Sequence, residues 1–323
     1  MDLQNGFAIT ITWPDFKGKQ AGSWYDPLMR ILRINKNFHY KVGHASIILI
    51  NSEGNCFYFD CGRYEAPYQK GRIRDNSTDC GLNIKTRAVL QNGKISNIEK
   101  LLTEIQLNKT CKGFGTLKAA YCTINFESAY SNAKCVQKKG IVPFGPFIRP
   151  GTNCCRFIQQ IIIKGKPIMK YKWKLKILFP LLPRPLTIIK ILPNNINLPE
   201  REKIEGYKFV SHFFKDLINT QHCYDKTNVK TTLKEPLKSN NIPSDSHWLS
   251  GEMSGSWFHL SQFENSYFIT RFSENGIEEC SGNFRLKSKN KFEIDKPYFF
   301  SYLSHCSKST IIQDKEIFEF IRL

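Results

Sequence analysis

Two residues far apart in the chain, Cys154 and His44, have the types and surroundings for nucleophilic catalysis. Cys154 follows the segment 150–153, in which Pro-Gly precedes Thr-Asn, two good helix N-cap residues. The apolar residues of 157–163 then recur at helical spacing, which predicts a short buried helix with Cys154 in its first turn. Unpaired backbone N–H groups and the helix dipole favour a thiolate there. The alternative is a cysteine that only fills the core.

A cysteine nucleophile needs a base within hydrogen-bond reach and a third group that orients the base. His44 follows Gly43 within the predicted strand 39–50. A lone histidine at the start of a strand can also be purely structural, and that alternative stays open.

The third group follows from a predicted hairpin with a turn over 51–55. A return strand from Cys56 places Asp60 opposite Ser46, and therefore diagonal to His44 on the same face. Tyr58 is the next residue along that face. A slip of one residue in this register would turn Asp60 to the other face.

Four segments resemble known proteins: Lys41-Val42-Gly43-His44-Ala45, 58–64 (Tyr-Phe-Asp-Cys-Gly-Arg-Tyr), 151–157 (Gly-Thr-Asn-Cys-Cys-Arg-Phe) and 251–258 (Gly-Glu-Met-Ser-Gly-Ser-Trp-Phe). A strand histidine that precedes a helix cysteine resembles the circularly permuted papain-like superfamily. That superfamily includes permuted NlpC-type amidases, YiiX-like proteins and lecithin–retinol acyltransferase-like enzymes. The segments resemble more closely an uncharacterised bacterial family of unknown function, over nearly the whole chain.

This resemblance implies a Cys154 nucleophile and a His44 base, and the strand geometry adds Asp60 as the third member. It also suggests that a small polar residue usually follows the nucleophile, whereas this chain has Cys155. Tyr58, Arg63 and Arg72 are the candidate substrate-binding residues. Arg63, Arg72 and Arg74 could clamp a carboxylate or phosphate of the substrate, and the alternative is that they are solvated surface groups.

The composition describes a globular protein with an anionic partner. The chain has 323 residues, is 41% hydrophobic and carries a formal net charge of +19. Such a charge indicates an acidic membrane surface, polymer or nucleic acid, although compositional drift would also produce it. Nucleic acid ranks last, because no motif for its recognition is present.

The basic residues concentrate in 164–193, which contains eight basic and no acidic residues. The mixture with Trp173 and aliphatic residues resembles a membrane-surface element. Within it, the strict alternation over 170–177 favours a strand with its lysines facing water.

The cysteines predict free thiols. Eleven cysteines form an odd set without framework spacing, which favours a reducing compartment over disulfides. Cys280, His305, Cys306 and the pair 222–223 match no common metal-site spacing, so we expect no metal and no cofactor. Without a visible signal segment or a bilayer-spanning run, we expect a cytoplasmic protein, at most associated with a membrane surface.

The remaining patterns predict further elements. We expect strands over 7–13, 84–90 and 116–124, a helix opened by a Ser96/Glu99 capping box, a helix capped by Asn125, and a helix over 205–219.

These elements predict an α+β fold: a permuted papain-like core of antiparallel sheet plus helices, over 1–220, including 164–193. Residues 221–246 are expected to form a linker or long loop, and 247–323 a β-rich module. The expected function is a cysteine hydrolase (amidase, peptidase or esterase) or acyltransferase acting on an amide- or ester-containing substrate through a covalent acyl-enzyme. The alternative is a non-catalytic module that binds an anionic lipid or polymer.

Overall fold

A computed structural model describes most of the chain. The described residues are 4–19, 23, 25–36, 39–40, 43–145, 148, 150–177, 184–200, 223–225, 228–231, 234–263, 266–288 and 290–323. The helix expected over 205–219 and His222 lie outside them.

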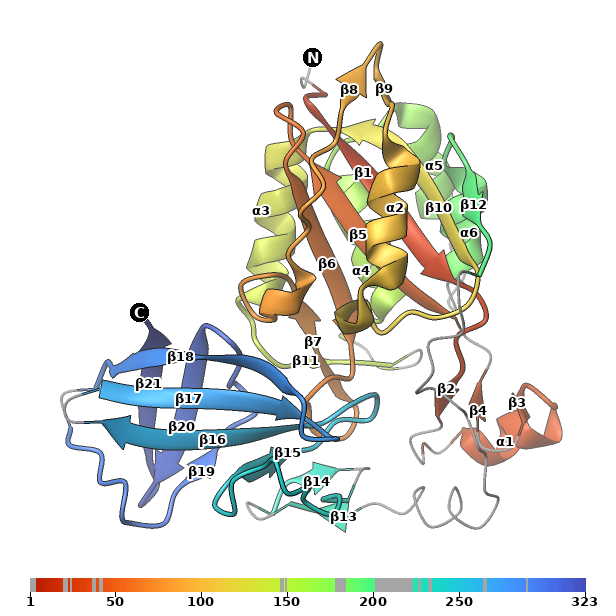
Figure 1. Ribbon diagram of the computed structural model, residues 1–323. Helices are drawn as coiled ribbons and strands as arrows, with labels where there is room; N and C mark the ends of the chain where they lie inside the picture. The colour runs from red at the N-terminus through yellow and green to blue at the C-terminus, as the bar shows by residue number, and fades with distance from the viewer. Residues whose placement is uncertain are drawn as a thin grey trace.

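The first part of the chain builds a seven-stranded sheet in the order β11-β7-β6-β5-β1-β10-β12 (Figure 1). All of its strand pairs are antiparallel. Its central strands are apolar on both faces because helices cover both. The strands are β1 (Gly6–Trp13), β5 (His44–Ile50), β6 (Cys56–Gly62), β7 (Lys70–Arg74), β10 (Leu117–Ile124), β11 (Val142–Pro143) and β12 (Ile196–Leu198).

Helices pack on the two faces of this sheet (Figure 1). On one face, α2 (Ile98–Leu107) buries Leu101, Leu102 and Ile105 against β1 and β5. On the other face, the side chains of Ala45, Ile47 and Leu49 share one core cluster with residues of three helices. These are α3 (Phe126–Gln137), α4 (Cys154–Lys164) and α6 (Pro185–Ile191), and α5 (Met169–Ile177) packs beside them.

The last part of the chain builds a second seven-stranded sheet in the order β15-β16-β17-β18-β21-β20-β19, with a core rich in phenylalanine. Its strands are β15 (His247–Leu249), β16 (Ser256–Phe263), β17 (Ser266–Ser273), β18 (Glu278–Leu286), β19 (Phe299–Phe300), β20 (Lys308–Gln313) and β21 (Glu316–Arg322).

Short elements complete the described chain. They are β2 (Gly18–Lys19), α1 (Asp26–Ile31), β3 (Asn35–Lys36), β4 (His39–Tyr40), η1 (Cys80–Leu82), β8 (Leu90–Gln91), β9 (Lys94–Ile95), η2 (Lys109–Cys111), β13 (Cys223–Tyr224) and β14 (Lys230–Thr231).

The two sheets meet through buried charges. Arg271 of β17 donates from Nη2 to Oδ1 of Asp79 at 2.9 Å, and Arg72 of β7 donates from Nη1 to Oδ2 of the same carboxylate at 2.8 Å. Burial alone would raise the pKa of Asp79. The guanidinium groups of Arg72, Arg271 and Arg74 outweigh burial and hold that pKa well below its usual range. Glu65 closes the network by pairing with Arg72.

Main-chain hydrogen bonds reinforce this interface. The N–H of Glu65 donates to the carbonyl of Ser254 at 3.1 Å, and the N–H of Met253 donates to the carbonyl of Arg63 at 3.0 Å. The segment 251–256 therefore holds the chain that leaves β6.

Several expected elements are confirmed. The strands 7–13 and 116–124 correspond to β1 and β10, and the helix capped by Asn125 corresponds to α3. The hairpin register is also confirmed, since Ser46 pairs with Asp60.

Other expectations are wrong. Residues 84–89 form no strand, and α2 begins after Asn97 without a side-chain cap, so the Ser96/Glu99 capping box is not formed. The expected strand 170–177 is instead part of the helix α5. Its exposed lysines lie on several sides of the helix, so the alternation of lysines with other residues in the sequence does not define two faces. Among the described residues, no helix is long and apolar enough to cross a membrane.

We predict that Asp79→Asn destabilises the fold by about 3–5 kcal/mol, because it leaves buried guanidinium groups without their countercharge. Urea unfolding at pH 7 measures this effect. At that pH Asp79 is ionised and its stabilisation is fully present; the stabilisation is lost as pH falls through the lowered folded-state pKa.

The matched control is Lys296→Gln, which removes a surface pair with Glu293. Its unfolding midpoint should match that of the wild type. Equal midpoints for both variants would contradict a structural role for the buried network.

Candidate active site

Cys154 is the first residue of α4 and is partly exposed. The N-cap is Asn153, whose side-chain oxygen accepts a hydrogen bond from the N–H of Arg156 at 2.9 Å. Phe157, Ile158, Ile161 and Ile162 anchor the helix in the core. The cap and this apolar face fix the thiol at the positive end of the helix.

The environment of Cys154 lowers its pKa well below the usual value. The largest cause is a hydrogen bond from the thiol of Cys155, whose sulfur lies 3.8 Å from that of Cys154. A hydrogen bond and charge from His44 and the N–H of Ala45 add to it, against the opposing effect of burial. The same contact and burial raise the pKa of Cys155, which is 2% exposed. The two thiols therefore differ: Cys154 favours the thiolate and Cys155 the neutral thiol.

His44 is held by aromatic rings at the first position of β5. Its imidazole is 3% exposed and stacks on the indole of Trp13, with ring centroids 5.6 Å apart. Trp13 is its cross-strand neighbour in β1. Gly113 also lies against the indole, where a Cβ atom would be 2.0 Å from the ring. The imidazole therefore has little freedom to rotate.

Asp60 lies on β6 near His44, but its nearest partner is an arginine. Its Oδ2 is 3.9 Å from Nε2 of His44. Arg74 grips both carboxylate oxygens, from Nε to Oδ1 at 3.0 Å and from Nη2 to Oδ2 at 2.6 Å. The hydroxyl of Tyr58 donates to Oδ2 at 3.2 Å. Asp60 is thus a buried carboxylate held in one orientation.

Tyr64 joins Asp60 to His44, a role that the sequence did not predict. Its hydroxyl lies 3.3 Å from Nε2 of His44 and 3.5 Å from Oδ2 of Asp60. Arg74 covers the phenol ring, with its guanidinium carbon 3.5 Å from the centroid. Gly62 makes room for the ring, because a Cβ atom there would lie 2.3 Å from it. The sequence feature that could have indicated this role is the spacing Gly62-Arg63-Tyr64, because a glycine two residues earlier lets the tyrosine ring pack back against the end of the strand.

The candidate substrate-binding residues have separate places. Tyr58 is buried against Asp60, and Arg72 is buried between Asp79 and Glu65. The view of the arginines as solvated surface groups is wrong for Arg72 and Arg74, which are 5% and 2% exposed. Each is buried because it neutralises a buried carboxylate.

Arg63 lines a small cavity with a volume of about 30 Å³. The other lining residues are Ser23, Tyr25, Gln69, Phe144, Gly145 and Ile148. Gly145 donates its N–H to the carbonyl of Thr152 at 3.0 Å, which places this wall of the cavity against the segment before Cys154. Arg63 pairs with Glu252, and burial lowers the pKa of its guanidinium.

The described residues contain one group of sulfur ligands close enough together for a metal ion, Cys80, Cys280 and Cys306, outside this site. Cys280 and Cys306 form a disulfide, so the expectation of free thiols is wrong for this pair.

We predict that Cys154 reacts with iodoacetamide at pH 6.5 faster than the other thiols of the protein, because its pKa is lowered. His44→Ala removes a cause of that lowering and should slow the labelling roughly tenfold. Timed labelling followed by peptide mapping measures both rates.

Cys155 offers a matched pair of variants. Cys155→Ser keeps a hydrogen-bond donor and should preserve fast labelling of Cys154, whereas Cys155→Ala should slow it. Preferential labelling of Cys155 in the wild type would contradict the assignment.

Comparison with known proteins gives two family matches. The family described as "Type VI secretion system effector TseH-like" matches residues 8–171, and the family described as "DUF6695 C-terminal domain" matches residues 246–323. Among solved structures, the crystal structure of the Type VI secretion system effector TseH is similar, with 18% identity and a TM-score of 0.39, over 61% of this chain and 94% of that one. No curated protein matches. Because the first match covers just over half of the 323 residues, the chain belongs to the Type VI secretion system effector TseH-like family.

Proposed function

We propose that this protein is a cysteine hydrolase or acyltransferase with a permuted papain-like core, acting on an amide or ester. The observation that carries the proposal is Cys154 at a helix N-terminus with a pKa lowered by Cys155 and also by His44. A nucleophile, a base and a group that orients the base are the minimum for covalent acyl transfer. Membership of an effector family fits an enzyme that modifies a component of another cell.

The first step is attack of the Cys154 thiolate on the acyl carbon. The C–S bond forms as the C–N or C–O bond breaks, and protonated His44 gives its proton to the leaving amine or alcohol. The N–H of Cys154, at the start of α4, contributes to stabilising the oxyanion. Water or an acceptor alcohol or amine, deprotonated by His44, then releases the acyl group and restores the thiol.

Tyr64 and Asp60 orient the base in this mechanism. Nε2 of His44 faces the Tyr64 hydroxyl at 3.3 Å, which leaves Nδ1 for the thiol. Oδ2 of Asp60 lies 3.9 Å from the same Nε2. Because Tyr64 lies between them, we assign it the hydrogen bond that an aspartate or asparagine alone makes in simpler triads.

The cavity beside Arg63 is the proposed place for the acyl part of the substrate. Its walls combine the apolar ring of Phe144 with the polar groups of Tyr25 and Gln69. The Arg63 charge is shared with Glu252, so we expect a polar substrate group at this position rather than a free anion. Arg72 and Tyr58 support the site indirectly, because each contacts and positions a buried carboxylate.

We also propose a division of labour along the chain. Residues 1–220 form the domain with the reacting groups, and residues 221–246 link it to the β-rich module. That module, residues 247–323, holds the segment that follows β6. A reducing compartment such as the cytoplasm would keep the Cys154 thiol free for reaction.

We predict that Cys154→Ala, His44→Ala and the double variant lose nearly the same activity, at least about 10³-fold, because the two groups act as one unit. Activity is measured on a panel of acyl esters and amides. Intact mass spectrometry should show an acyl adduct on the wild type and none on Cys154→Ala. Losses that multiply in the double variant would contradict a coupled pair.

Tyr64→Phe is the cleanest test of the orienting group. It should lower kcat roughly tenfold, the worth of one hydrogen bond of about 1–1.5 kcal/mol, and leave the fold intact. Asp60→Asn is less informative, because it also strips Arg74 of its countercharge and should lower the unfolding midpoint. An unchanged kcat and pH profile in Tyr64→Phe would remove Tyr64 from the mechanism.

A second candidate function, binding to an anionic membrane surface or polymer, is favoured by α5. The helix carries four lysines, and four exposed apolar residues lie on it or next to it: Ile168, Met169, Trp173 and Ile177. Lysines near an acidic lipid surface contribute about 1 kcal/mol each, and exposed apolar side chains add burial in the interface. Such binding would place the enzyme at its substrate, or replace catalysis if no acyl substrate exists.

We predict binding to vesicles of acidic phospholipid at low salt that weakens sharply as the salt concentration rises. Changing Lys172, Lys174 and Lys176 together to Gln should weaken it at least tenfold. Vesicle sedimentation measures the bound fraction.

The charge-matched control changes Lys291, Lys296 and Lys315 of the second sheet to Gln and should bind like the wild type. Equal losses of vesicle binding in the two triple variants would show that binding depends only on net charge. No binding at low salt would rule out this function.

A further inference from the structure

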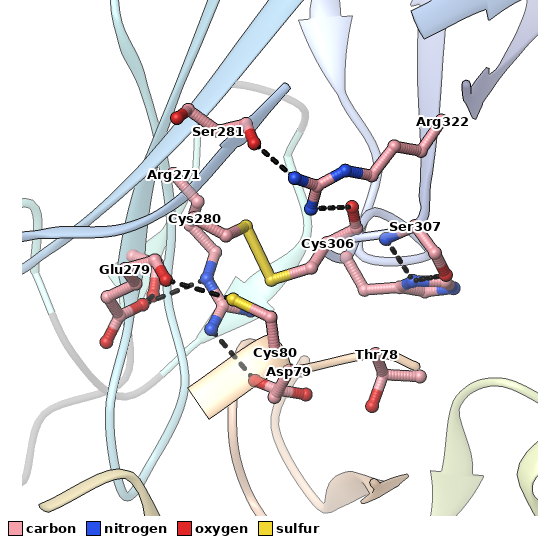
Figure 2. Close-up of a disulfide and its surroundings, with 12 residues drawn as sticks. Thr78, Asp79, Cys80, Arg271, Glu279, Cys280, Ser281, Cys306, Ser307 and Arg322 are labelled. Carbon is pink, nitrogen blue, oxygen red and sulfur yellow. Dashed lines mark hydrogen bonds and ion pairs between the residues drawn. A yellow bond between two sulfur atoms is a disulfide. The ribbon is translucent and has the colours of Figure 1, made fainter. Parts of the chain in front are cut away.

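Three sulfurs from distant parts of the chain gather where the two sheets meet (Figure 2). Cys280 of β18 and Cys306, just before β20, form a disulfide. Cys80, at the start of η1, belongs to the first part of the chain, and its sulfur lies within 4.8 Å of each of the other two. Cys80 is exposed and hydrogen-bonds to the carbonyl of Glu279 at 3.3 Å. A free thiol therefore lies within reach of a disulfide that belongs to the other sheet.

We propose that these cysteines form a thiol–disulfide exchange site that can link the two sheets covalently. The Cys80 thiolate attacks the sulfur of Cys306, the Cys80–Cys306 bond forms, and the Cys280–Cys306 bond breaks to leave a thiolate on Cys280. One disulfide and one thiol are present before and after, so the exchange needs no oxidant or reductant.

The main chain favours attack on Cys306. The N–H of Cys306 donates to the carbonyl of Thr78 at 2.9 Å, only two residues before Cys80. The attacking and attacked residues are therefore already tied together across the interface, and exchange needs only a small movement of side chains. Cys306 is 3% exposed, which makes it the poorer place for the released thiolate.

The charges favour a thiolate on Cys280. Arg271 is its cross-strand neighbour, so the two side chains lie on the same face of the sheet, and Figure 2 draws Arg271 among the residues around the disulfide. Arg271 binds Asp79 and Glu279 through Nη2 and Nε, while its buried Nη1 has no hydrogen-bond partner among the described residues. That free donor can stabilise a leaving thiolate. The same positive charge opposes a metal cation at this place.

The exchanged link would lock the interface that braces the proposed active site. The Cys80–Cys306 bond would lie next to the ion pair between Asp79 and Arg271, on the network that also holds Glu65 and Arg72. Redox conditions that act on these sulfurs would therefore change how firmly the second sheet holds the segment after β6.

The test needs no reductant. The wild type is labelled with N-ethylmaleimide, acid-quenched, digested and mapped by mass spectrometry. Exchange predicts label on both Cys80 and Cys280, together with a Cys80–Cys306 peptide. In Cys80→Ser, the label on Cys280 should disappear. Label on Cys80 alone, with Cys280 and Cys306 always joined, would overturn the proposal.

A second variant tests the link itself. Cys280→Ser treated with oxidised glutathione should form the Cys80–Cys306 disulfide with release of two molecules of glutathione, and peptide mapping should show the linked peptide, whereas exposed Cys135 should carry at most a glutathione adduct. Cys80 that stays free or carries only glutathione in this variant would overturn the proposal. So would stoichiometric Zn²⁺ uptake by the reduced wild type that is lost in Cys80→Ser, because it would assign a metal site instead.

Discussion

The buried carboxylate of Asp60 is the constraint on which the rest of the structure depends. Removing a carboxylate from water costs several kcal/mol unless a countercharge and hydrogen bonds replace the lost hydration. Arg74 supplies both through its two contacts, but it is then buried itself and lies 3.9 Å from Asp79. Asp79 in turn holds Arg72 and Arg271, so the charge beside His44 is balanced through a network that ends in the second sheet.

Much of the first sheet and the main parts of the site could be predicted because their causes are local. The cap at Asn153 and the apolar spacing behind it define α4 and the place of Cys154. The short turn of the hairpin fixes the register, which brings Asp60 to the face of His44. Even the ambiguity between the two cysteines is local in origin, since their contact makes one thiol acidic and the other not.

What could not be predicted depends on contacts between distant residues. The arginines were indistinguishable from surface residues until Asp60 and Asp79 were placed beside them. Cys280 and Cys306 are 26 residues apart, and only the folding of the second sheet brings them together. The alternation over 170–177 failed for another reason: a helix with lysines on several sides and a β-strand can share one pattern, and packing of Leu175 in the core decides between them.

The second sheet therefore belongs to the site, although it supplies no reacting group. The chain leaving β6 pairs with 251–256, and Tyr64 forms a bridge with Ser254 while its hydroxyl contacts His44. Gly251 permits this approach, since a Cβ atom there would lie 2.5 Å from the N–H nitrogen of Glu65. Tyr64 is thus held on one side by the second sheet and on the other by Arg74, whose charge belongs to the network that crosses the interface. The orientation of His44 consequently depends on both sheets together, and a change at their interface reaches His44 through Tyr64.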